Sequence, residues 1–365
     1  MFPRLEYLEW ISGRPEVALY DLGSSDLRGD RDHEPEAEPG PLKGLDDPPT
    51  GATLETQIAG EYGVEPEQVL VTAGATMANF AAAATALHRG PDTPKAEKQR
   101  VLVEKPGYEP LVKSPGALGA EVDRFLRGDH YSLDPDRVEK AVTDWTSLIT
   151  VTNRQNPSGV LTDHETLADV AEVARENDAP LLVDEVYAPF VTDARDGPFG
   201  GPTAVDIDGT VVTGSLTKFY GLGDLRVGWV VADEAFVDHA RSIEHHFSAV
   251  SGTGRALGRR ALHNSDHLAE RSRALVRENA ELLADFLADR DDVDGFVPEG
   301  STYAFLDPVN VGGDELAGAA WEDGVLVVPG RFFGDPDRVR VSLGRTPSEV
   351  GPGLDALGSV LDQFQ

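Results

Sequence analysis

One lysine stands out in the second half of the chain. Lys218 lies in the stretch "SLTKFYGLGDLRVGW" (215–229), and no other lysine occurs after Lys140, although arginine stays common there. Lys218 follows an apolar, strand-like run, where burial would lower the pKa of its amine and favour the nucleophilic neutral form. A primary amine can form a Schiff base with a carbonyl group. We therefore expect Lys218 to be a catalytic residue rather than a solvated loop lysine.

Further candidate residues, most of them polar, follow several predicted strands. They are Gly74, Ala75, Thr76, Tyr108, Asn156, Asp184, Tyr187 and Ser215, and Arg226 opens the strand after Lys218. Ligands of parallel α/β sheets bind at the carboxyl ends of the strands. We therefore expect these residues to lie together around one ligand.

Their chemistry suits a flat, phosphorylated, nitrogen-containing ligand. Asp184 ends a run of apolar residues and needs a cation or several donors, which a pyridinium N–H would supply. Residues 74–76 open a helix whose free N–H groups favour a phosphate, and Arg226 could bind the same phosphate with two hydrogen bonds. Each residue also has a simpler interpretation, since Asp184 could cap a helix and Tyr108 could fill the core.

Five sequence motifs, in order along the chain, resemble the class I and II aminotransferases, which are pyridoxal-phosphate enzymes of fold type I. "NPSG" (156–159) is similar to the family's Asn-Pro-Thr/Ser-Gly, and "DEVY" (184–187) is similar to its Asp-x-x-Tyr. The stretch 215–229 resembles the family's Ser-x-Ser/Thr-Lys and Gly-Leu-Arg-x-Gly-Trp motif. "VLVVPGRFFG" and "VRVSLG" resemble the end of its small domain.

The resemblance implies a role for each candidate at the cofactor. Lys218 would form the Schiff base with pyridoxal 5'-phosphate and move the proton at the substrate's α-carbon, and Asp184 would pair with the ring nitrogen. The remaining implied cofactor residues are Asn156 and Tyr187 at the phenolic oxygen, Tyr108 stacked on the ring, and Ser215, Arg226, Gly74, Ala75 and Thr76 at the phosphate.

The resemblance also implies how the substrates bind. Arg340, in "VRVSLG", would hold the α-carboxylate of an amino acid or 2-oxo acid, with Asn156 close by. Ser25, in "LGSSD" (22–26), would belong to the segment that covers the substrate. The family further implies a homodimer with active sites at the subunit interface.

One position departs from the family pattern, and the sequence does not identify the amino-acid substrate. Asp46 stands where many relatives place a tyrosine that reaches the partner subunit's phosphate. An arginine for a second carboxylate would point to aspartate as substrate, and Arg28 and Arg255 are candidates that the sequence does not place in the site.

Short apolar runs alternate with helical patterns from about residue 52, which predicts an α/β fold with a mostly parallel sheet and helices on both faces. For this family we expect seven strands and a smaller α+β domain. We expect residues 1–35 to belong to the small domain, 45–264 to form the large cofactor domain, and 265–365 to complete the small one. Thr162 is the expected N-cap of a helix over 162–178, with Glu165 completing a capping box.

The composition narrows the function classes. The chain has 64 Asp and Glu against 32 Lys and Arg, a formal charge of −32, which argues against nucleic acid and anionic membranes as partners. Such a surface is typical of proteins adapted to high salt.

The absence of cysteine excludes disulfides. No apolar signal core or membrane span is evident, so we expect a cytoplasmic protein. His263 and His267 have a metal-compatible spacing but no third ligand, so we expect no metal.

Three functions fit these observations. Transamination between an amino acid and a 2-oxo acid, with aspartate and 2-oxoglutarate as a first guess, is the expectation we favour. A lyase or decarboxylase on the same scaffold would use the same cofactor residues, because these chemistries differ in which bond of the α-carbon breaks. A non-catalytic cofactor-binding module is the third, although the full lysine, aspartate and arginine set and the lack of a DNA-binding segment argue against it.

Overall fold

The computed structural model describes residues 2–27, 37–88 and 98–365. Its largest element is a seven-stranded sheet in the order β2-β8-β7-β6-β5-β3-β4. β8 pairs antiparallel with β2 and β7, and the remaining pairs in this sheet are parallel. The prediction of a mostly parallel seven-stranded sheet is therefore confirmed. The strands are β2 (Val69–Thr72), β3 (Arg100–Lys105), β4 (Glu121–Leu126), β5 (Thr146–Thr152), β6 (Leu181–Asp184), β7 (Thr210–Ser215) and β8 (Gly228–Val231).

Helices cover both faces of this sheet. The helices packed on it are α3 (Leu54–Tyr62), α4 (Ala75–Leu87), α5 (Glu109–Ala117), α6 (Pro135–Ala141), α7 (His164–Glu176), α8 (Glu234–Glu244) and α9 (Gly252–His263). Successive strand residues face opposite sides, so Leu182 packs with α4 and α8 whereas Val183 packs with α7 and α9. Burial on both sides explains why the strands are apolar without alternation.

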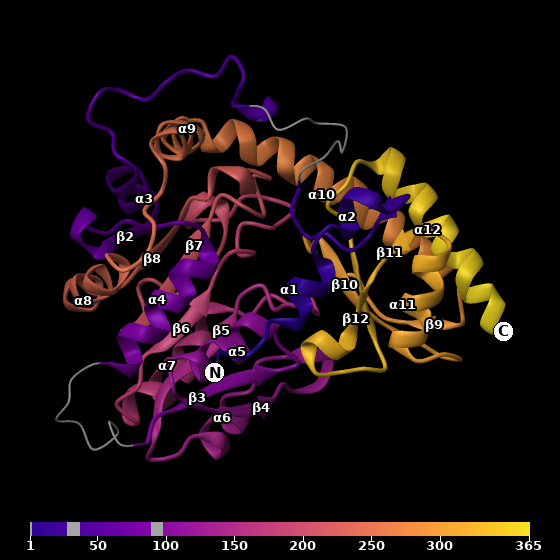
Figure 1. Cartoon of the computed structure of the whole chain (residues 1–365), viewed down its shortest axis with the longest axis horizontal. Coiled ribbons are helices and arrows are strands. Elements are labelled where there is room, and N and C mark those ends of the chain that lie inside the picture. Colours follow the sequence, from indigo (N-terminus) through magenta and orange to yellow (C-terminus); the bar gives the residue numbers. More distant parts are fainter. Residues whose placement is uncertain (1, 28–36, 89–97) are drawn as a thin grey trace.

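A smaller α+β region lies beside the large sheet (Figure 1). Its four-stranded antiparallel sheet has the order β12-β13-β10-β9, and a parallel pair joins β1 to β11. The elements are α1 (Glu6–Ile11), α2 (Arg14–Val17), β1 (Tyr20–Asp21), α10 (Ser265–Ala288), β9 (Val293–Asp294), β10 (Tyr303–Pro308), α11 (Gly313–Glu322), β11 (Val325–Leu326), β12 (Val328–Pro329), β13 (Val339–Ser342) and α12 (Pro347–Leu361). The N-terminal segment thus adds a strand to C-terminal structure.

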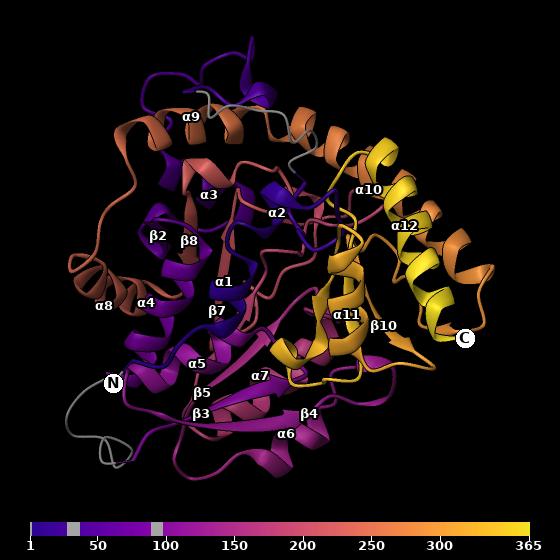
Figure 2. The ribbon, with the colours of Figure 1, turned by 45° about the vertical axis from the view of Figure 1, so that its right-hand side comes forward.

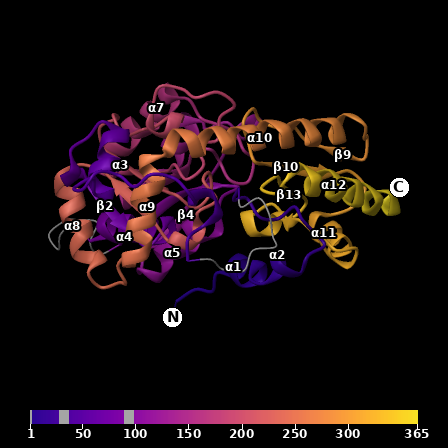
Figure 3. The ribbon, with the colours of Figure 1, turned by 90° about the horizontal axis from the view of Figure 1, so that it is seen from above.

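The long helix α10 connects the two regions. It runs from the large sheet to the small region in Figure 3, and Figure 2 shows α9 and α10 following one another along one side of the molecule. Val276 of α10 belongs to the core of the large region, and Leu283 belongs to the core of the small one. Asn264, where we predict the domain boundary, lies between α9 and α10, and the boundary itself stays a prediction.

One local prediction is wrong. The N-cap of α7 is Asp163 and not Thr162, because the helix begins one residue later than expected, at His164. The Asp163 side chain accepts a hydrogen bond of 2.8 Å from the backbone N–H of Thr166.

Within the part of the chain that the structure describes, no helix combines the length and the apolar character that crossing a membrane requires.

Candidate active site

The carboxyl ends of β5, β6 and β7 open into a cavity of about 260 Å³. The large region, the small region and the N-terminal segment all contribute to its walls. The predicted site residues that line it are Ser25, Ala75, Thr76, Tyr108, Asn156, Asp184, Tyr187, Ser215, Lys218, Arg226 and Arg340, and Tyr7, Asn79, Thr152, Val186 and Thr217 complete it. The fold therefore brings together residues that are more than 300 positions apart.

Lys218 lies a short distance beyond the end of β7. Its Nζ donates a hydrogen bond of 3.5 Å to the hydroxyl of Ser25, and this hydroxyl is 2.7 Å from that of Tyr187. The expectation of a lowered amine pKa is wrong. Burial does act to lower the pKa of Lys218, but the electrostatic effects of Tyr187, Asp26 and Tyr7 together outweigh it, so the pKa is raised. The sequence did not reveal this balance because residues 7 and 26 come from the far N-terminal segment.

Asp184 is buried at the end of β6 and holds two donors. Its Oδ2 accepts a hydrogen bond of 2.8 Å from Asn79 Nδ2, and its Oδ1 accepts one of 3.1 Å from the Val186 N–H. The hydroxyl of Thr213 donates to Asn79 Oδ1 over 2.6 Å, which fixes the orientation of the amide. Burial raises the pKa of Asp184 to about 6, and the two donors oppose this rise.

Asn79 is a site residue that the sequence prediction missed. It lies on α4, where it is the only side-chain amide in "ATMANFAAAATAL", and it is 105 residues from Asp184. The signal was an amide on a helix otherwise made largely of alanine, one turn after the predicted phosphate turn. A buried amide on such a helix needs a polar partner, and a strand-end carboxylate is one.

The turn before α4 has the geometry of an anion site. Gly74 adopts φ +90°, and a Cβ at this position would lie 2.9 Å from the guanidinium of Arg226. A glycine is thus required for Arg226 to approach the first N–H groups of α4. Arg226 donates to the Ala73 carbonyl over 3.2 Å, and Ser215 lines the same cavity.

Arg340 lies on β13 and is 1 % exposed. One of its terminal nitrogens donates to Asn156 Oδ1 over 2.9 Å, and the other donates to the Gly23 carbonyl over 2.9 Å and to the Tyr7 hydroxyl over 3.3 Å. Its Nε has no hydrogen-bond partner within the residues described. Burial acts to lower its pKa, but Tyr7 and Tyr187 outweigh this effect and the pKa is raised, so the guanidinium stays charged.

Tyr7 is the second site residue that was missed. Its backbone N–H donates to Glu109 Oε2 over 2.7 Å, which ties α1 to the start of α5. Its ring meets that of Tyr108 edge to face at 5.9 Å. Because Tyr7 contacts Arg340 across 333 residues, no local pattern could have assigned it.

Some candidates lie elsewhere. Arg28 falls outside the described residues. Arg255 does not line the cavity and pairs with Glu55 over 2.5 Å. The backbone carbonyl of Asp46 accepts a hydrogen bond from the side chain of Asn264. Across residues 2–27, 37–88 and 98–365, no group of three His, Asp or Glu side chains is placed to bind a metal ion, and His263 and His267 belong to no such group.

These observations can be tested against pyridoxal phosphate. The glycine turn, the α4 N-terminus, Ser215 and Arg226 would together hold a phosphate. Asp184 is a buried carboxylate placed to receive a cationic N–H, and Lys218 supplies a primary amine in the same cavity. The residues present therefore fit this cofactor.

Comparison with known proteins agrees with this fit. The model of the family described as "Aminotransferase class I and II" matches residues 18–357. The chain belongs to this family and is a pyridoxal-phosphate-dependent aminotransferase of fold type I.

Three individual proteins illustrate its relatives. Capreomycidine synthase of Streptomyces vinaceus is 29 % identical over 271 residues, which cover 72 % of this chain and 68 % of that protein. Aspartate aminotransferase of Bacillus subtilis is 25 % identical over 321 residues, covering 80 % and 77 %. The crystal structure of a PLP-dependent aminotransferase from Streptococcus suis superposes with a TM-score of 0.84 at 25 % identity, covering 100 % of this chain and 99 % of the other.

Proposed function

We propose that this enzyme transfers the amino group of an L-amino acid to a 2-oxo acid in two half-reactions, with its cofactor bound to Lys218. The observation that carries the proposal is the presence of Lys218, Asp184 and Arg340 on one cavity. An amine, a carboxylate for a ring nitrogen and a guanidinium for a carboxylate are the three groups that the reaction requires.

The residues of the chain divide the work. Pyridoxal phosphate, when bound, supplies an electron-withdrawing ring that stabilises negative charge at the substrate's α-carbon. Asp184 would keep a proton on the ring nitrogen, and Asn156 and Tyr187 would hydrogen-bond the phenolic oxygen. Lys218 Nζ would accept and return the proton of the α-carbon. Tyr108 would stack on the ring.

Substrate binding would center on Arg340. Its Nε is a buried donor without a partner in the described residues, and its terminal nitrogens are held by Asn156 and Gly23. A carboxylate would satisfy the free donor and complete a charged pair with a buried guanidinium. We assign Arg340 and Asn156 to the substrate side of the cavity, whereas Ser25, which the sequence predicted there, hydrogen-bonds Lys218.

The amino donor is the finer part of the proposal. Lys218, Arg226 and Arg340 are the cations among the described lining residues, and each already has a partner in the scheme. Arg255 pairs with Glu55, so it offers no support for aspartate as donor. Aspartate with 2-oxoglutarate remains the first pair to assay, because aspartate aminotransferase of Bacillus subtilis is among the relatives.

A second function has one observation in its favour. Capreomycidine synthase, a relative that is not named as an aminotransferase, is 29 % identical to the chain. A lyase, decarboxylase or other non-transaminating reaction would use the same Lys218 and Asp184.

Product analysis separates the two functions. The cofactor-loaded enzyme is incubated at molar salt with a panel of amino donors and 2-oxoglutarate. Transamination predicts glutamate and the matching 2-oxo acid in equal amounts. Ammonia, carbon dioxide or a rearranged amino acid without glutamate would contradict it and support the second function.

We further propose a cytoplasmic homodimer that works at high salt. The supports are the net charge of −32 and the homodimer that the family resemblance implies. Sedimentation and thermal unfolding in 0.1 M and 3 M KCl test this, with the dimer and the higher unfolding temperature expected in 3 M KCl. A monomer at every salt concentration, or a protein least stable in 3 M KCl, would contradict it.

A further inference from the structure

The hydroxyl of Ser25 lies between two groups of the proposed chemistry. It is 3.5 Å from Lys218 Nζ and 2.7 Å from the hydroxyl of Tyr187, and Ser25 is 3 % exposed. A serine hydroxyl has one donor and two acceptor sites, so it can accept from the lysine and share a second hydrogen bond with the tyrosine.

The backbone fixes this arrangement. The N–H of Leu27 donates to the carbonyl of Lys218 over 3.0 Å, so the loop that carries Ser25 is bound to the lysine's own main chain. At the other end of the loop, Asp21 Oδ1 accepts the N–H groups of Gly23 and Ser24 over 3.0 and 2.9 Å. Asp21 also forms a buried ion pair with Arg345.

The same loop reaches the proposed carboxylate site. The carbonyl of Gly23, two residues before Ser25, accepts the hydrogen bond from Arg340. The loop packs so closely on the end of β13 that a Cβ at Gly344 would lie 2.3 Å from the Asp26 carbonyl. Ser25 therefore has little freedom to leave Lys218 while Arg340 keeps its position.

We propose that Ser25 is a positioning residue for Lys218. Its hydroxyl accepts a hydrogen bond from the Lys218 amine and is linked to Tyr187, and it thereby holds the amine beside the α-carbon while the lysine accepts and returns the proton. The proton moves between the α-carbon and Nζ, and Ser25 keeps its own. This inference rests on the proposed function and gives Ser25 a role toward the lysine instead of the substrate.

Steady-state kinetics distinguish the two roles. In Ser25→Ala, we expect kcat to fall about tenfold and KM for the amino donor to stay within about twofold, because a hydrogen bond to Lys218 acts in the chemical step. Ser25→Thr keeps a hydroxyl and should recover most of kcat. Ser24→Ala is the matched control, because Ser24 gives its backbone N–H to Asp21 and keeps that bond. A raised KM with unchanged kcat in Ser25→Ala would overturn the proposal and assign Ser25 to the substrate.

A second measurement needs no turnover. Lys218 of the cofactor-free protein is labelled with an amine-specific reagent, and the rate is followed by peptide mass as a function of pH. The ammonium form binds the hydroxyl more strongly than the neutral amine does, so Ser25→Ala should label about threefold faster at pH 8. The difference should vanish at high pH, where the amine is neutral in every variant.

The two measurements can fail separately. Labelling profiles that are identical in the parent, Ser24→Ala and Ser25→Ala would overturn the contact between Ser25 and Lys218. Absence of glutamate formation by the parent enzyme would instead overturn the proposed function, and the labelling result would still decide whether Ser25 acts on the lysine.

Discussion

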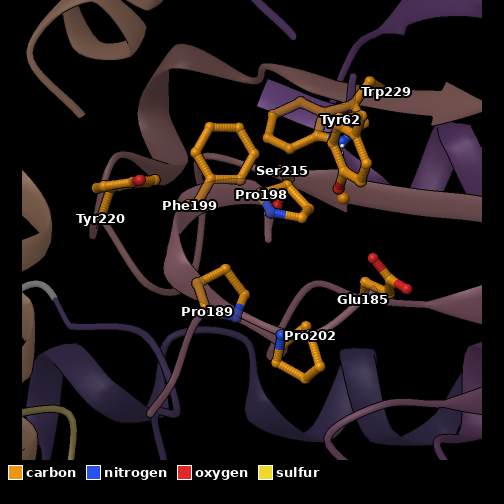
Figure 4. A pocket seen from close by; sticks show the side chains of 11 residues that line it. Tyr62, Glu185, Pro189, Pro198, Phe199, Pro202, Ser215, Tyr220 and Trp229 are labelled. Carbon is orange, nitrogen blue, oxygen red and sulfur yellow. Dashed lines mark hydrogen bonds between the residues drawn. The ribbon is translucent and has the colours of Figure 1, made fainter. Parts of the chain in front are cut away.

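Asp184 and Glu185 are consecutive in the sequence, buried, and acidic, yet they face opposite sides of the sheet. Asp184 faces α4 and the cavity of about 260 Å³. Glu185 faces a cavity of about 10 Å³ lined by Tyr62, Phe199, Tyr220 and Trp229, and Figure 4 shows the aromatic and proline side chains that line this cavity with Glu185. Alternation along the strand thus gives neighbouring carboxyl groups different environments.

Their hydrogen bonds differ accordingly. Each oxygen of Asp184 accepts one hydrogen bond, whereas only one oxygen of Glu185 does so, from the N–H of Ala204 over 2.7 Å. The other oxygen of Glu185 has no partner in the described residues. Burial raises the pKa of Glu185 to about 8 and that of Asp184 to about 6. At neutral pH Asp184 is therefore charged and can pair with a cation, whereas Glu185 is largely neutral. We conclude that donors, not burial alone, distinguish the functional acid from the structural one.

Activity should respond most strongly to this difference. Asp184→Asn removes the charge that would hold a proton on the ring nitrogen, and we expect kcat/KM of the cofactor-loaded enzyme to fall by about 10³-fold. Glu185→Gln should stay within about threefold of the parent, because its side chain faces away from the cavity. Equal losses in the two variants would contradict the comparison.

The free energy of unfolding should respond to substitution of Glu185, which activity should barely sense. Burial raises the pKa of Glu185 in the folded state from its ordinary value of 4.5 to about 8. The folded state therefore binds more protons than the unfolded state between these pH values, and stability falls as pH rises through this window. Glu185→Gln avoids this loss and should be more stable than the parent at pH 8.5, by on the order of 3 kcal/mol, with a smaller gain at pH 5. Urea unfolding of the cofactor-free protein at both pH values measures it. A difference that does not grow with pH would contradict the assignment.

Asn79 provides the finest test of the comparison. Its amide lowers the pKa of Asp184, so Asn79→Ala should raise that pKa further above its present value of about 6. Protonated Asp184 cannot pair with the ring nitrogen, so cofactor binding weakens as pH falls through the pKa of Asp184. In Asn79→Ala, absorbance titration of the cofactor-free protein should show this weakening at a pH about 0.5 to 1 higher than in the parent. Thr85→Ala, on the same helix, removes only a hydrogen bond to the Ala81 carbonyl and should leave the profile unchanged.

The sequence predicted what depends on strand ends and short motifs. Asp184 ends β6 and Lys218 lies shortly after β7, so the parallel strands place both at one edge of the sheet. Arg226 lies just before β8, which runs antiparallel to β7 and therefore starts at the same edge. Asn79 and Tyr7 were missed because their partners lie 105 and 333 residues away, and the direction of the Lys218 pKa was wrong for the same reason. Interactions between distant segments depend on how the domains pack, which a local pattern does not report.

The central claim is that Lys218 carries the cofactor, and one chemical measurement tests it directly. The protein is loaded with pyridoxal phosphate, reduced with borohydride, digested and analysed by mass spectrometry. We predict that the added mass lies on the peptide containing Lys218, and that Lys218→Arg neither retains the label nor develops the visible absorbance of the bound cofactor. A label on another lysine, or parent-level activity in Lys218→Arg, would contradict the account.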